Sequence, residues 1–201
     1  MSLWKRLWVY FLGVGVEKSQ SGIQVKLVAE IGPEPRKSNY VSRLKPVQRL
    51  SPNFKKWPGR KVTMVVVHST ASDKAEPALN WMCDPKSVVS AHYCIGKAGE
   101  IWQLVGEEDV AFHAGASEWM GTRAINLLSV GIELVNRNDV KDHYTAPQLV
   151  VLTQLVNDLV ARHAIQKHNI VRHLDIALPA GRKTDPAGFP WQDWLDGLDA
   201  S

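Results

Sequence analysis

The chain has 201 residues, of which 45% are hydrophobic and 22% are charged, so it is long enough for one packed domain with an additional segment. It holds only 2 cysteines and no apolar run of the roughly 18 residues that span a bilayer, which excludes a disulfide scaffold and a transmembrane protein. The formal net charge of +4 is uneven, because residues 1–61 hold 13 Lys and Arg against 3 Glu, a net +10, whereas residues 62–201 hold 11 against 17 Asp and Glu, a net −6. We therefore expect a soluble or surface-attached protein whose N-terminal end is basic.

The basic end predicts a separate N-terminal arm over residues 1–60, followed by a compact domain over 61–201. Residues 1–16 hold two cations before an apolar stretch, but no small-residue cleavage site follows, so we expect cytoplasmic synthesis without a signal peptide. Alternating apolar residues over 23–29 predict a short strand, and the Pro-, Ser-, Asn- and Lys-rich residues 32–60 predict a wrapped linker. An arm of this charge fits an anionic wall polymer or a membrane surface, and a merely solvated extension is the alternative.

The compact domain is predicted to alternate between strands and helices. The expected strands cover 62–67, 88–95, 101–105, 129–135 and 171–176, and the expected helices cover 77–82, the segment from about Thr145 to 163, and 189–198. The first strand is a continuous β-branched run that is typical of burial on both faces, and the second and third form a hairpin. This order predicts an α/β fold with a single mixed central sheet flanked by helices.

Two histidines and one aspartate stand at or after predicted strands, where proteins commonly hold functional side chains. His68 follows the first strand, His173 lies near the end of the strand over 171–176, and Asp185 lies in the loop beyond it. Two imidazoles and a carboxylate suit zinc, and they leave one tetrahedral position open for water, as catalytic sites require. The spacing matches no compact motif such as H-E-x-x-H, so structural histidines are the alternative on these residues alone.

Five segments of the domain carry a more specific signal, namely residues 65–70, 90–93, 112–119, 126–134, and the pair 172–173 with 185–186. Together they resemble the zinc-dependent N-acetylmuramoyl-L-alanine amidases, a family that includes phage lysozyme-type amidases, bacterial wall-recycling amidases and animal peptidoglycan recognition proteins. The resemblance covers roughly residues 60–195 and does not reach the arm. It implies a peptidoglycan recognition protein-like amidase fold and one zinc ion per chain held by His68, His173 and Asp185. It also implies cleavage of the amide bond between N-acetylmuramic acid and L-alanine in peptidoglycan or its fragments.

Glu133 and Lys183 are the expected catalytic side chains. Glu133 lies in a predicted strand among apolar residues, where a carboxylate is costly unless it is used or paired. The resemblance implies that Glu133 moves a proton from the attacking water to the leaving amine, and a salt-bridged strand glutamate is the alternative. Lys183 resembles the family lysine that helps to hold the oxyanion; without the resemblance it is an ordinary loop lysine. Ala91 stands where some phage relatives have a catalytic tyrosine, which favours the mechanism that uses Glu133.

Four further residues are expected to contact substrate: His113, Trp119, Asn126 and Arg182. Arg182 suits a peptide carboxylate, because a guanidinium binds that group with two parallel hydrogen bonds. The alternatives are a supporting role for His113 and core or turn roles for Trp119 and Asn126.

Three other chemically active side chains are expected to be structural. His92 is expected to pack or form hydrogen bonds inside the hairpin. Cys83 and Cys94 are interpreted as buried thiols, with a disulfide as the alternative.

The leading hypothesis is therefore a monomeric zinc amidase that acts on peptidoglycan or muropeptides, as a phage endolysin or as a bacterial wall-degrading or recycling enzyme. The alternative from another class is a recognition module of the same fold that binds muropeptides without cleaving them. Such relatives generally lack a zinc ligand, whereas this sequence has three candidates. A serine hydrolase is disfavoured because no G-x-S-x-G motif occurs, and nucleic-acid binding is disfavoured because the arm carries no recognised motif for it.

Overall fold

The structure, a computed structural model, describes residues 15–19, 22–26 and 44–198. The chain divides into two compact units, Met1–Arg36 and Lys37–Ser201. In the first unit, β1 (Gly15–Ser19) pairs with β2 (Gly22–Lys26) as antiparallel strands. The strand expected over 23–29 is thus present in part as β2, and its residues 27–29 lie outside the described ranges.

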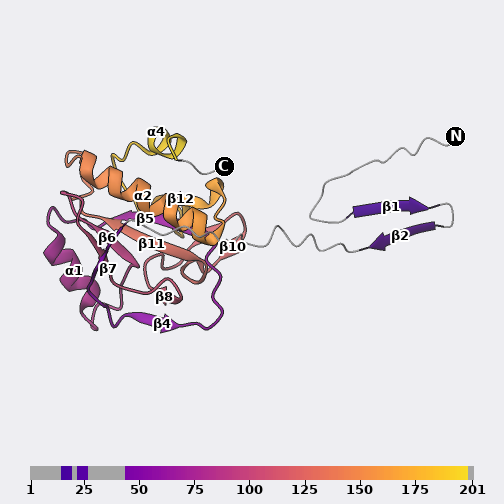
Figure 1. The fold of residues 1–201 in the computed structure, drawn as a ribbon, viewed down its shortest axis with the longest axis horizontal. Coiled ribbons are helices and arrows are strands. Elements are labelled where there is room, and N and C mark those ends of the chain that lie inside the picture. Colours follow the sequence, from indigo (N-terminus) through magenta and orange to yellow (C-terminus); the bar gives the residue numbers. More distant parts are fainter. Residues whose placement is uncertain (1–14, 20–21, 27–43, 199–201) are drawn as a thin grey trace. The chain divides into compact units, whose positions relative to one another are not determined.

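A six-stranded sheet forms the centre of the second unit (Figure 1). Its strands, in spatial order, are β12 (Ile170–Arg172), β5 (Met64–Ser69), β11 (Ser129–Leu134), β6 (Tyr93–Ile95), β7 (Ile101–Gln103) and β3 (Val47–Gln48). The first four strands are parallel, β7 runs antiparallel to β6, and β3 runs parallel to β7. The expected single mixed central sheet flanked by helices is confirmed.

One face of the sheet is covered by α2 (Ala146–His163) and α4 (Trp191–Asp196), as Figure 1 shows. Helix α2 begins where the sequence predicts, because the Thr145 side chain accepts a hydrogen bond from the Gln148 amide and Pro147 lies in the first turn. Its buried residues Leu152, Leu155, Val156 and Leu159 pack on Val65 and Val67 of β5 and on the matching face of β11. Fully burying each such side chain contributes about 1.5–3 kcal/mol, so this layer holds most of the apolar stabilisation.

The opposite face is covered by α1 (Ala75–Cys83), by α3 (His173–Ile176) and by loops. Met64 and Val66 of β5 point to this face and pack with Ile125 and Ile176. Strand β5 is therefore buried on both faces, as its β-branched sequence predicts. Smaller elements complete the unit: β4 (Phe54–Lys56) pairs with β8 (Asp109–Ala111), β9 (Glu118–Trp119) pairs with β10 (Thr122–Arg123), and two short 3-10 helices span Ile125–Leu127 and Lys167–Asn169.

Three expected elements differ from the structure. The strand expected over 88–95 begins only at Tyr93: Val88 has a left-handed φ of 54°, and the Ser90 amide donates to the Phe112 carbonyl, outside the central sheet. The strand expected over 171–176 ends at Arg172, where the Asp175 carboxylate accepts a hydrogen bond from the Arg172 amide and starts α3. The expectation of a linker over 32–60 is wrong for residues 44–60, which contain β3 and β4 and belong to the second unit; residues 32–43 lie outside the described residues.

Arg60 explains why this segment belongs to the second unit. Its half-buried guanidinium donates hydrogen bonds to the backbone carbonyls of Glu107, Asp109, Asn126, Leu127 and Ser129. Burial lowers the pKa of Arg60 to about 10, so the group stays charged at neutral pH. The side chain thus ties the loop before β8 to the loop before β11.

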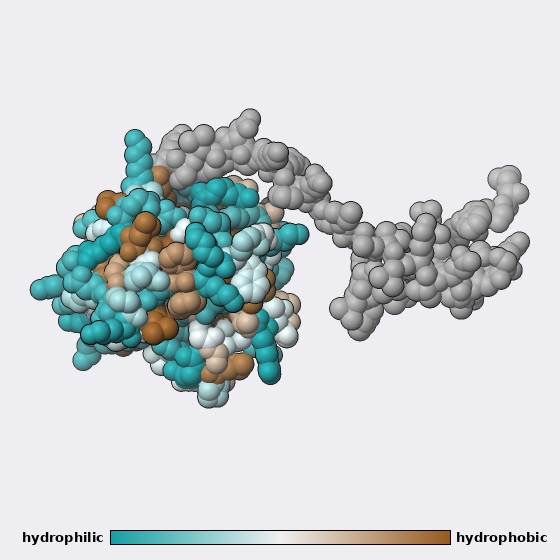
Figure 2. All heavy atoms as spheres, turned by 90° about the horizontal axis from the view of Figure 1, so that it is seen from below, coloured by the Kyte–Doolittle hydropathy of each residue, from teal (hydrophilic) through white to brown (hydrophobic). Residues whose placement is uncertain are grey.

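Among the described helices, none combines the length and the hydropathy that crossing a bilayer requires. Apolar side chains nevertheless reach the surface near the middle of the face shown in Figure 2. The large apolar side chains of Trp81, Val88 and Val89 are exposed to 58%, 64% and 36%. Trp81 and Val89 also line the cleft that contains the candidate site.

Candidate metal centre

Strand register places His68 and Glu133 side by side. The parallel strands β5 and β11 pair His68 directly with Glu133, and both side chains point to the sheet face opposite α2. Alternation requires this, because Val67 and Leu134, the neighbours of these two residues, belong to the α2-facing core. The sheet therefore presents an imidazole and a carboxyl group at the same level of adjacent strands.

His173 and Asp185 reach the same point from the C-terminal part of the chain. His173 is the first residue of α3, directly after β12, which is the other neighbour of β5. The loop that follows α3 returns to it, and the Leu174 amide donates a 3.0 Å hydrogen bond to the Asp185 carbonyl. The short helix that replaced the expected strand end is thus what aims His173 at His68.

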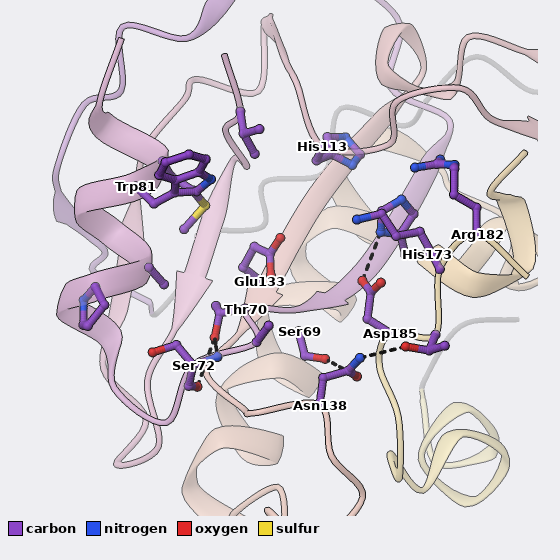
Figure 3. A pocket seen from close by; sticks show the side chains of 17 residues that line it. Ser69, Thr70, Ser72, Trp81, His113, Glu133, Asn138, His173, Arg182 and Asp185 are labelled. Carbon is purple, nitrogen blue, oxygen red and sulfur yellow. Dashed lines mark hydrogen bonds and ion pairs between the residues drawn. The ribbon is translucent and has the colours of Figure 1, made fainter. Parts of the chain in front are cut away.

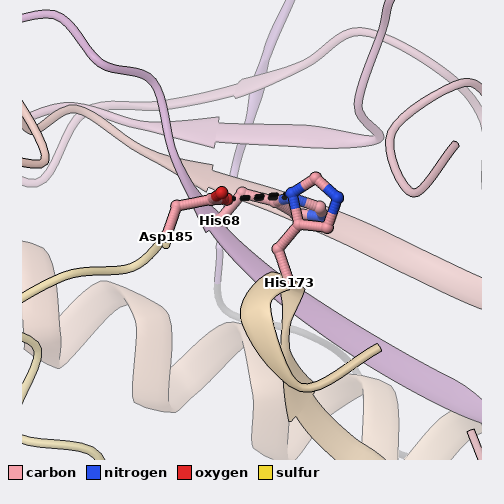
Figure 4. Close-up of side chains that lie close together, drawn as sticks. All are labelled: His68, His173 and Asp185. Atoms are coloured by element: carbon pink, nitrogen blue, oxygen red, sulfur yellow. Dashed lines mark hydrogen bonds and ion pairs between the residues drawn. The ribbon is translucent and has the colours of Figure 1, made fainter. Parts of the chain in front are cut away.

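The three side chains converge on one point (Figure 4). One ligand atom from each of His68, His173 and Asp185 lies within 4.8 Å of the others. Asp185 Oδ2 is 3.0 Å from His173 Nδ1 and 3.4 Å from His68 Nδ1, and all three residues are buried. Two imidazole nitrogens and a carboxylate oxygen at this spacing fit a divalent ion that prefers nitrogen and oxygen ligands.

The electrostatics of the group suit a cation. Burial lowers the pKa of His68 to about 4, so at neutral pH its imidazole is uncharged and can offer a lone pair. Burial opposes ionisation of Asp185, but the hydrogen bond with His173 and the nearby His68 imidazole hold its pKa far below its ordinary value. His173 Nε2 is buried and has no hydrogen-bond partner among the described residues.

Glu133 has the opposite character. Burial raises its pKa to about 8, and the nearby charge of Asp185 raises it further while that of Lys183 lowers it. Its Oε2 atom is buried without a hydrogen-bond partner among the described residues, so the alternative of a salt-bridged strand glutamate finds no support there. A carboxyl group held in this way can carry a proton near neutral pH.

A cleft of about 490 Å³ opens over these groups. Figure 3 shows Trp81 of α1 on one side of the cleft and His173 with Arg182 on the other, with Glu133 between them. Pro77, Met82 and Val89 extend the Trp81 side into an apolar wall, whereas the opposite wall carries Lys183 and Thr184. An apolar wall facing a basic one fits a ligand with an apolar face and an anionic end.

The cleft includes two of the four expected substrate contacts, His113 and Arg182. Arg182 donates to the carbonyls of Leu178, Ala114 and Ala116, so most of its donors already hold the loop that carries Asp185. Nδ1 of His113 lies 3.0 Å from Nε2 of His68. The expected catalytic Lys183 is exposed at the rim of the cleft.

The other two expected contacts do not line the cleft. Asn126 Oδ1 accepts hydrogen bonds of 3.1 Å and 2.8 Å from the amides of His113 and Ala114. Trp119 is half-buried and packs on the cluster around Met64 and Ile125. Because neither Asn126 nor Trp119 lines the cleft, their contact with substrate stays a prediction that the structure does not support.

The residues expected to be structural are placed inside the fold. His92 is buried, and its Nδ1 accepts a 3.0 Å hydrogen bond from the Gly131 amide. Cys83 and Cys94 are free thiols, so the alternative of a disulfide between them is wrong, and Cys94 is buried while Cys83 is half-buried.

Sequence reasoning missed Asn138, which fastens the Asp185 loop to the end of β5. Its Oδ1 accepts hydrogen bonds from the Ser69 hydroxyl (2.9 Å) and the Ala187 amide (2.7 Å), and its Nδ2 donates to Thr184 Oγ1 (3.0 Å). Asn138 has a left-handed φ of 59°, which asparagine tolerates better than most residues. The sequence holds no signal for these partners, because they come from distant segments.

Comparison with known proteins gives the same picture. A family model described as N-acetylmuramoyl-L-alanine amidase matches residues 58–188. The N-acetylmuramoyl-L-alanine amidase AmiD of Escherichia coli (strain K12) is 40% identical over 148 residues, which cover 66% of this chain and 51% of AmiD. The 1,6-anhydro-N-acetylmuramyl-L-alanine amidase AmpD of Citrobacter freundii is 39% identical over 106 residues, which cover 53% of this chain and 54% of AmpD.

A solved structure of AmiD from E. coli in complex with anhydro-N-acetylmuramic acid-L-Ala-D-gamma-Glu-L-Lys superposes with a TM-score of 0.62 at 32% identity. The match covers 78% of this chain and 62% of that one. The chain thus spans about half the length of the curated relatives it matches.

Proposed function

Since this chain belongs to the N-acetylmuramoyl-L-alanine amidase family, matched over residues 58–188, we propose that it hydrolyses the amide bond between N-acetylmuramic acid and L-alanine in peptidoglycan or its fragments. The observation that carries the proposal is the convergence of His68, His173 and Asp185 beside Glu133 in one cleft. AmiD and AmpD, which are similar to this chain, are amidases by name, and the AmiD complex contains an anhydromuramyl peptide.

In this proposal one zinc ion per chain is held by His68, His173 and Asp185. Such an ion supplies an activated water and an electrophilic centre for the amide carbonyl. The neutral imidazole of His68 and the ionised carboxylate of Asp185 are the protonation states that metal ligation requires. One carboxylate against a divalent ion leaves a net positive site, which favours an electron-rich carbonyl oxygen.

Glu133 moves the proton in this mechanism. Its carboxylate takes a proton from the attacking water, and the resulting carboxylic acid gives that proton to the amide nitrogen as the C–N bond breaks. The raised pKa of Glu133 favours the second step, because a buried carboxylic acid near neutral pH can hold the proton until the amine accepts it. Lys183, at the rim of the same cleft, donates a hydrogen bond to the oxyanion that forms on the carbonyl.

The walls of the cleft support an orientation for the substrate. The carboxylates of the stem peptide face the basic wall that carries Lys183, and the sugar ring faces the apolar wall at Trp81. Cleavage of recycled fragments and of intact wall both remain within this proposal, as does synthesis in the cytoplasm.

The test is to incubate the purified protein with N-acetylmuramoyl-L-alanyl-D-glutamyl peptide and to follow the release of the free peptide by mass spectrometry. We expect release that stops with chelator, returns with zinc, and is lost in His68→Ala, His173→Ala and Asp185→Ala. Metal analysis should give about one zinc per wild-type chain and less in each variant. Binding of the peptide with no release at any metal concentration would instead support a recognition module.

A further inference from the structure

A line of three buried polar groups runs away from the metal centre behind His68. His68 Nε2 lies 3.0 Å from His113 Nδ1, His113 Nε2 lies 3.2 Å from Ser129 Oγ, and Ser129 Oγ lies 2.7 Å from the Ile125 carbonyl oxygen. His68, His113 and Ser129 are 1%, 8% and 0% exposed, so the groups are largely shielded from bulk water. The protons of this line must therefore be arranged among the groups themselves.

The Ile125 carbonyl at the end of this line fixes the direction of every hydrogen bond in it. A carbonyl can only accept, so the Ser129 hydroxyl donates its proton to Ile125 and offers a lone pair to His113. The proton between Ser129 and His113 is then on Nε2 of His113. A buried imidazolium without a carboxylate partner is costly, so His113 is neutral and its Nδ1 accepts from Nε2–H of His68.

This arrangement leaves Nδ1 of His68 without a proton. That atom lies 3.4 Å from Asp185 Oδ2, and a shared cation would stabilise a nitrogen lone pair and a carboxylate oxygen that face each other in this way. The direction of the hydrogen bonds thus agrees with the direction in which a metal ion is expected.

The absence of a side chain at Gly131 leaves the space that the His113 ring occupies. A Cβ atom at Gly131 of β11 would lie 2.4 Å from Cγ of His113, so no other residue fits beneath the ring without moving it. The Asn126 side chain holds the backbone amide of His113 from the other direction. Gly131 and Asn126 together restrict the ring to the position that the line requires.

We propose that His113 and Ser129 are positioning residues that hold His68 in the tautomer with Nε2 protonated, so that Nδ1 faces the metal. This inference rests on the proposed function for the identity of the ion, and it gives His113 a role behind a metal ligand in place of the substrate contact that the sequence predicts. Hydrogen bonds to the far nitrogen of a metal-binding histidine typically change metal affinity by 10–100-fold.

The first experiment determines the tautomers in the wild-type protein by ¹⁵N NMR of the histidine side chains, without metal and with zinc. We expect Nε2–H and unprotonated Nδ1 for His113 in both states, and the same for His68 with zinc at Nδ1. A proton on Nδ1 of His113 at pH 7 would overturn the proposal. The metal-free measurement stands even if the chain proves not to hydrolyse muropeptides, so the two failures are distinguishable.

The second experiment measures zinc affinity by competition with a chromogenic chelator. We expect His113→Phe to weaken zinc binding by about 10–100-fold, Ser129→Ala to weaken it several-fold, and His113→Gln to recover part of the loss through its amide oxygen. Ser51→Ala is the matched control, because Ser51 is a buried serine that also donates to a carbonyl, that of Met82, and accepts from an amide, that of Asn53. Equal zinc affinity in Ser129→Ala, His113→Phe and the wild type would refute the role.

Discussion

The buried Glu133 carboxyl group lowers the stability of the metal-free protein at neutral pH. Its folded-state pKa of about 8 lies above the ordinary value of 4.5, so the folded protein binds this proton more tightly than the unfolded chain does. The contribution to stability is therefore complete below pH 4.5 and is lost as pH rises toward 8. By pH 7 the loss is on the order of 3 kcal/mol in the metal-free protein.

We therefore expect Glu133→Gln to stabilise the metal-free protein at pH 7 to 8 and to have little effect near pH 4, because the amide keeps the shape and cannot ionise. Urea unfolding of chelated wild type and variant across this pH range measures the difference. The same variant should lose amidase activity, since it cannot accept a proton. A variant whose stability falls with pH as steeply as that of the wild type would contradict the assignment.

Asn138 gives a second prediction at the level of one side chain. Removing it frees Ser69, Thr184 and Ala187 from each other, so the loop that carries Asp185 loses its attachment to β5. Asn138→Gly is the informative change, because glycine accepts the left-handed backbone of this position and only the side chain is lost. We expect about tenfold weaker zinc binding and a similar drop in kcat/KM. Asn80→Ala, on the exposed face of α1, is the control and should change neither quantity.

The chemical types of the site residues could be read from the sequence more easily than the contacts that position them. His68, His173 and Asp185 stand out through the resemblance to the amidases, whereas their residue types and spacing alone left structural histidines as the alternative. Ser129 and Asn138 do not stand out, because a serine in a strand and an asparagine in a turn are common, and their partners lie far away in the chain. Proximity created by folding, and not residue type, gives these two their roles.

Among the elements, helix α2 is attached at its C-terminal end by an ionic cluster. Glu107 accepts hydrogen bonds from Tyr93 (2.5 Å) and Arg162 (2.6 Å) and contacts Nε2 of His163 at 2.6 Å. Burial opposes ionisation, but these partners lower the pKa of Glu107 to about 2. The cluster thus joins the last turn of α2 to β6 and to the loop before β8.

Because the folded-state pKa of Glu107 is depressed, its contribution to stability is present above pH 4.5 and is lost as pH falls toward 2. We expect the wild type to lose up to about 3 kcal/mol of unfolding free energy over this interval through Glu107, and Glu107→Gln to be less stable at pH 7 with a shallower acid dependence. Chemical denaturation between pH 2 and 7 measures both. Glu76→Gln, which removes an exposed pair with Arg49, should change the acid dependence far less than Glu107→Gln does.

Elements with a strong repeat were predictable and short ones were not. The β-branched run of β5 and the 3.6-residue spacing of α2 each predict burial that the structure contains. Strands β3 and β4 have two and three residues, too few for any alternation to show, and they exist because β7 and β8 offer them partners. The ends of the strands expected over 88–95 and 171–176 were set by local backbone conformation and by a capping carboxylate, which average hydrophobicity does not encode.

At the scale of the whole molecule, the charge division is weaker than the sequence suggests. Residues 37–61 contain 8 Lys and Arg and no acid, and they belong to the second unit, so residues 1–36 keep 5 Lys and Arg against 3 Glu, a net +2. Several of the basic groups in 44–61 are already used: Arg49 pairs with Glu76, Lys56 pairs with Asp109, and Arg60 holds five carbonyls. Attachment of the arm to an anionic wall polymer or a membrane surface stays a prediction, and it would depend on basic residues other than Arg49, Lys56 and Arg60.

Two truncations separate the arm from the folded unit. Deleting residues 1–36, which precede the second unit, should leave thermal stability and turnover of small muropeptides unchanged and should weaken binding to whole cell walls at low salt only. Deleting residues 1–60 should lower stability by several kcal/mol, because β3, β4 and the hydrogen bonds of Arg60 are lost. Circular dichroism melting and a wall pull-down assay give the two readouts. An equal loss of wall binding and turnover in the shorter deletion would show that the arm is structural.

The order of the ligands along the polypeptide has a consequence for biosynthesis. One imidazole comes from residue 68, and the other two ligands come from residues 173 and 185, close to the final helix. A nascent chain that has left the ribosome only as far as α2 already has β5, β6, β7 and β11, yet it has a single ligand and no coordination site. Ion binding by this group must therefore wait until residues 173–185 have been translated and α3 has formed beside β5, so a fragment that ends before residue 173 has no coordination site.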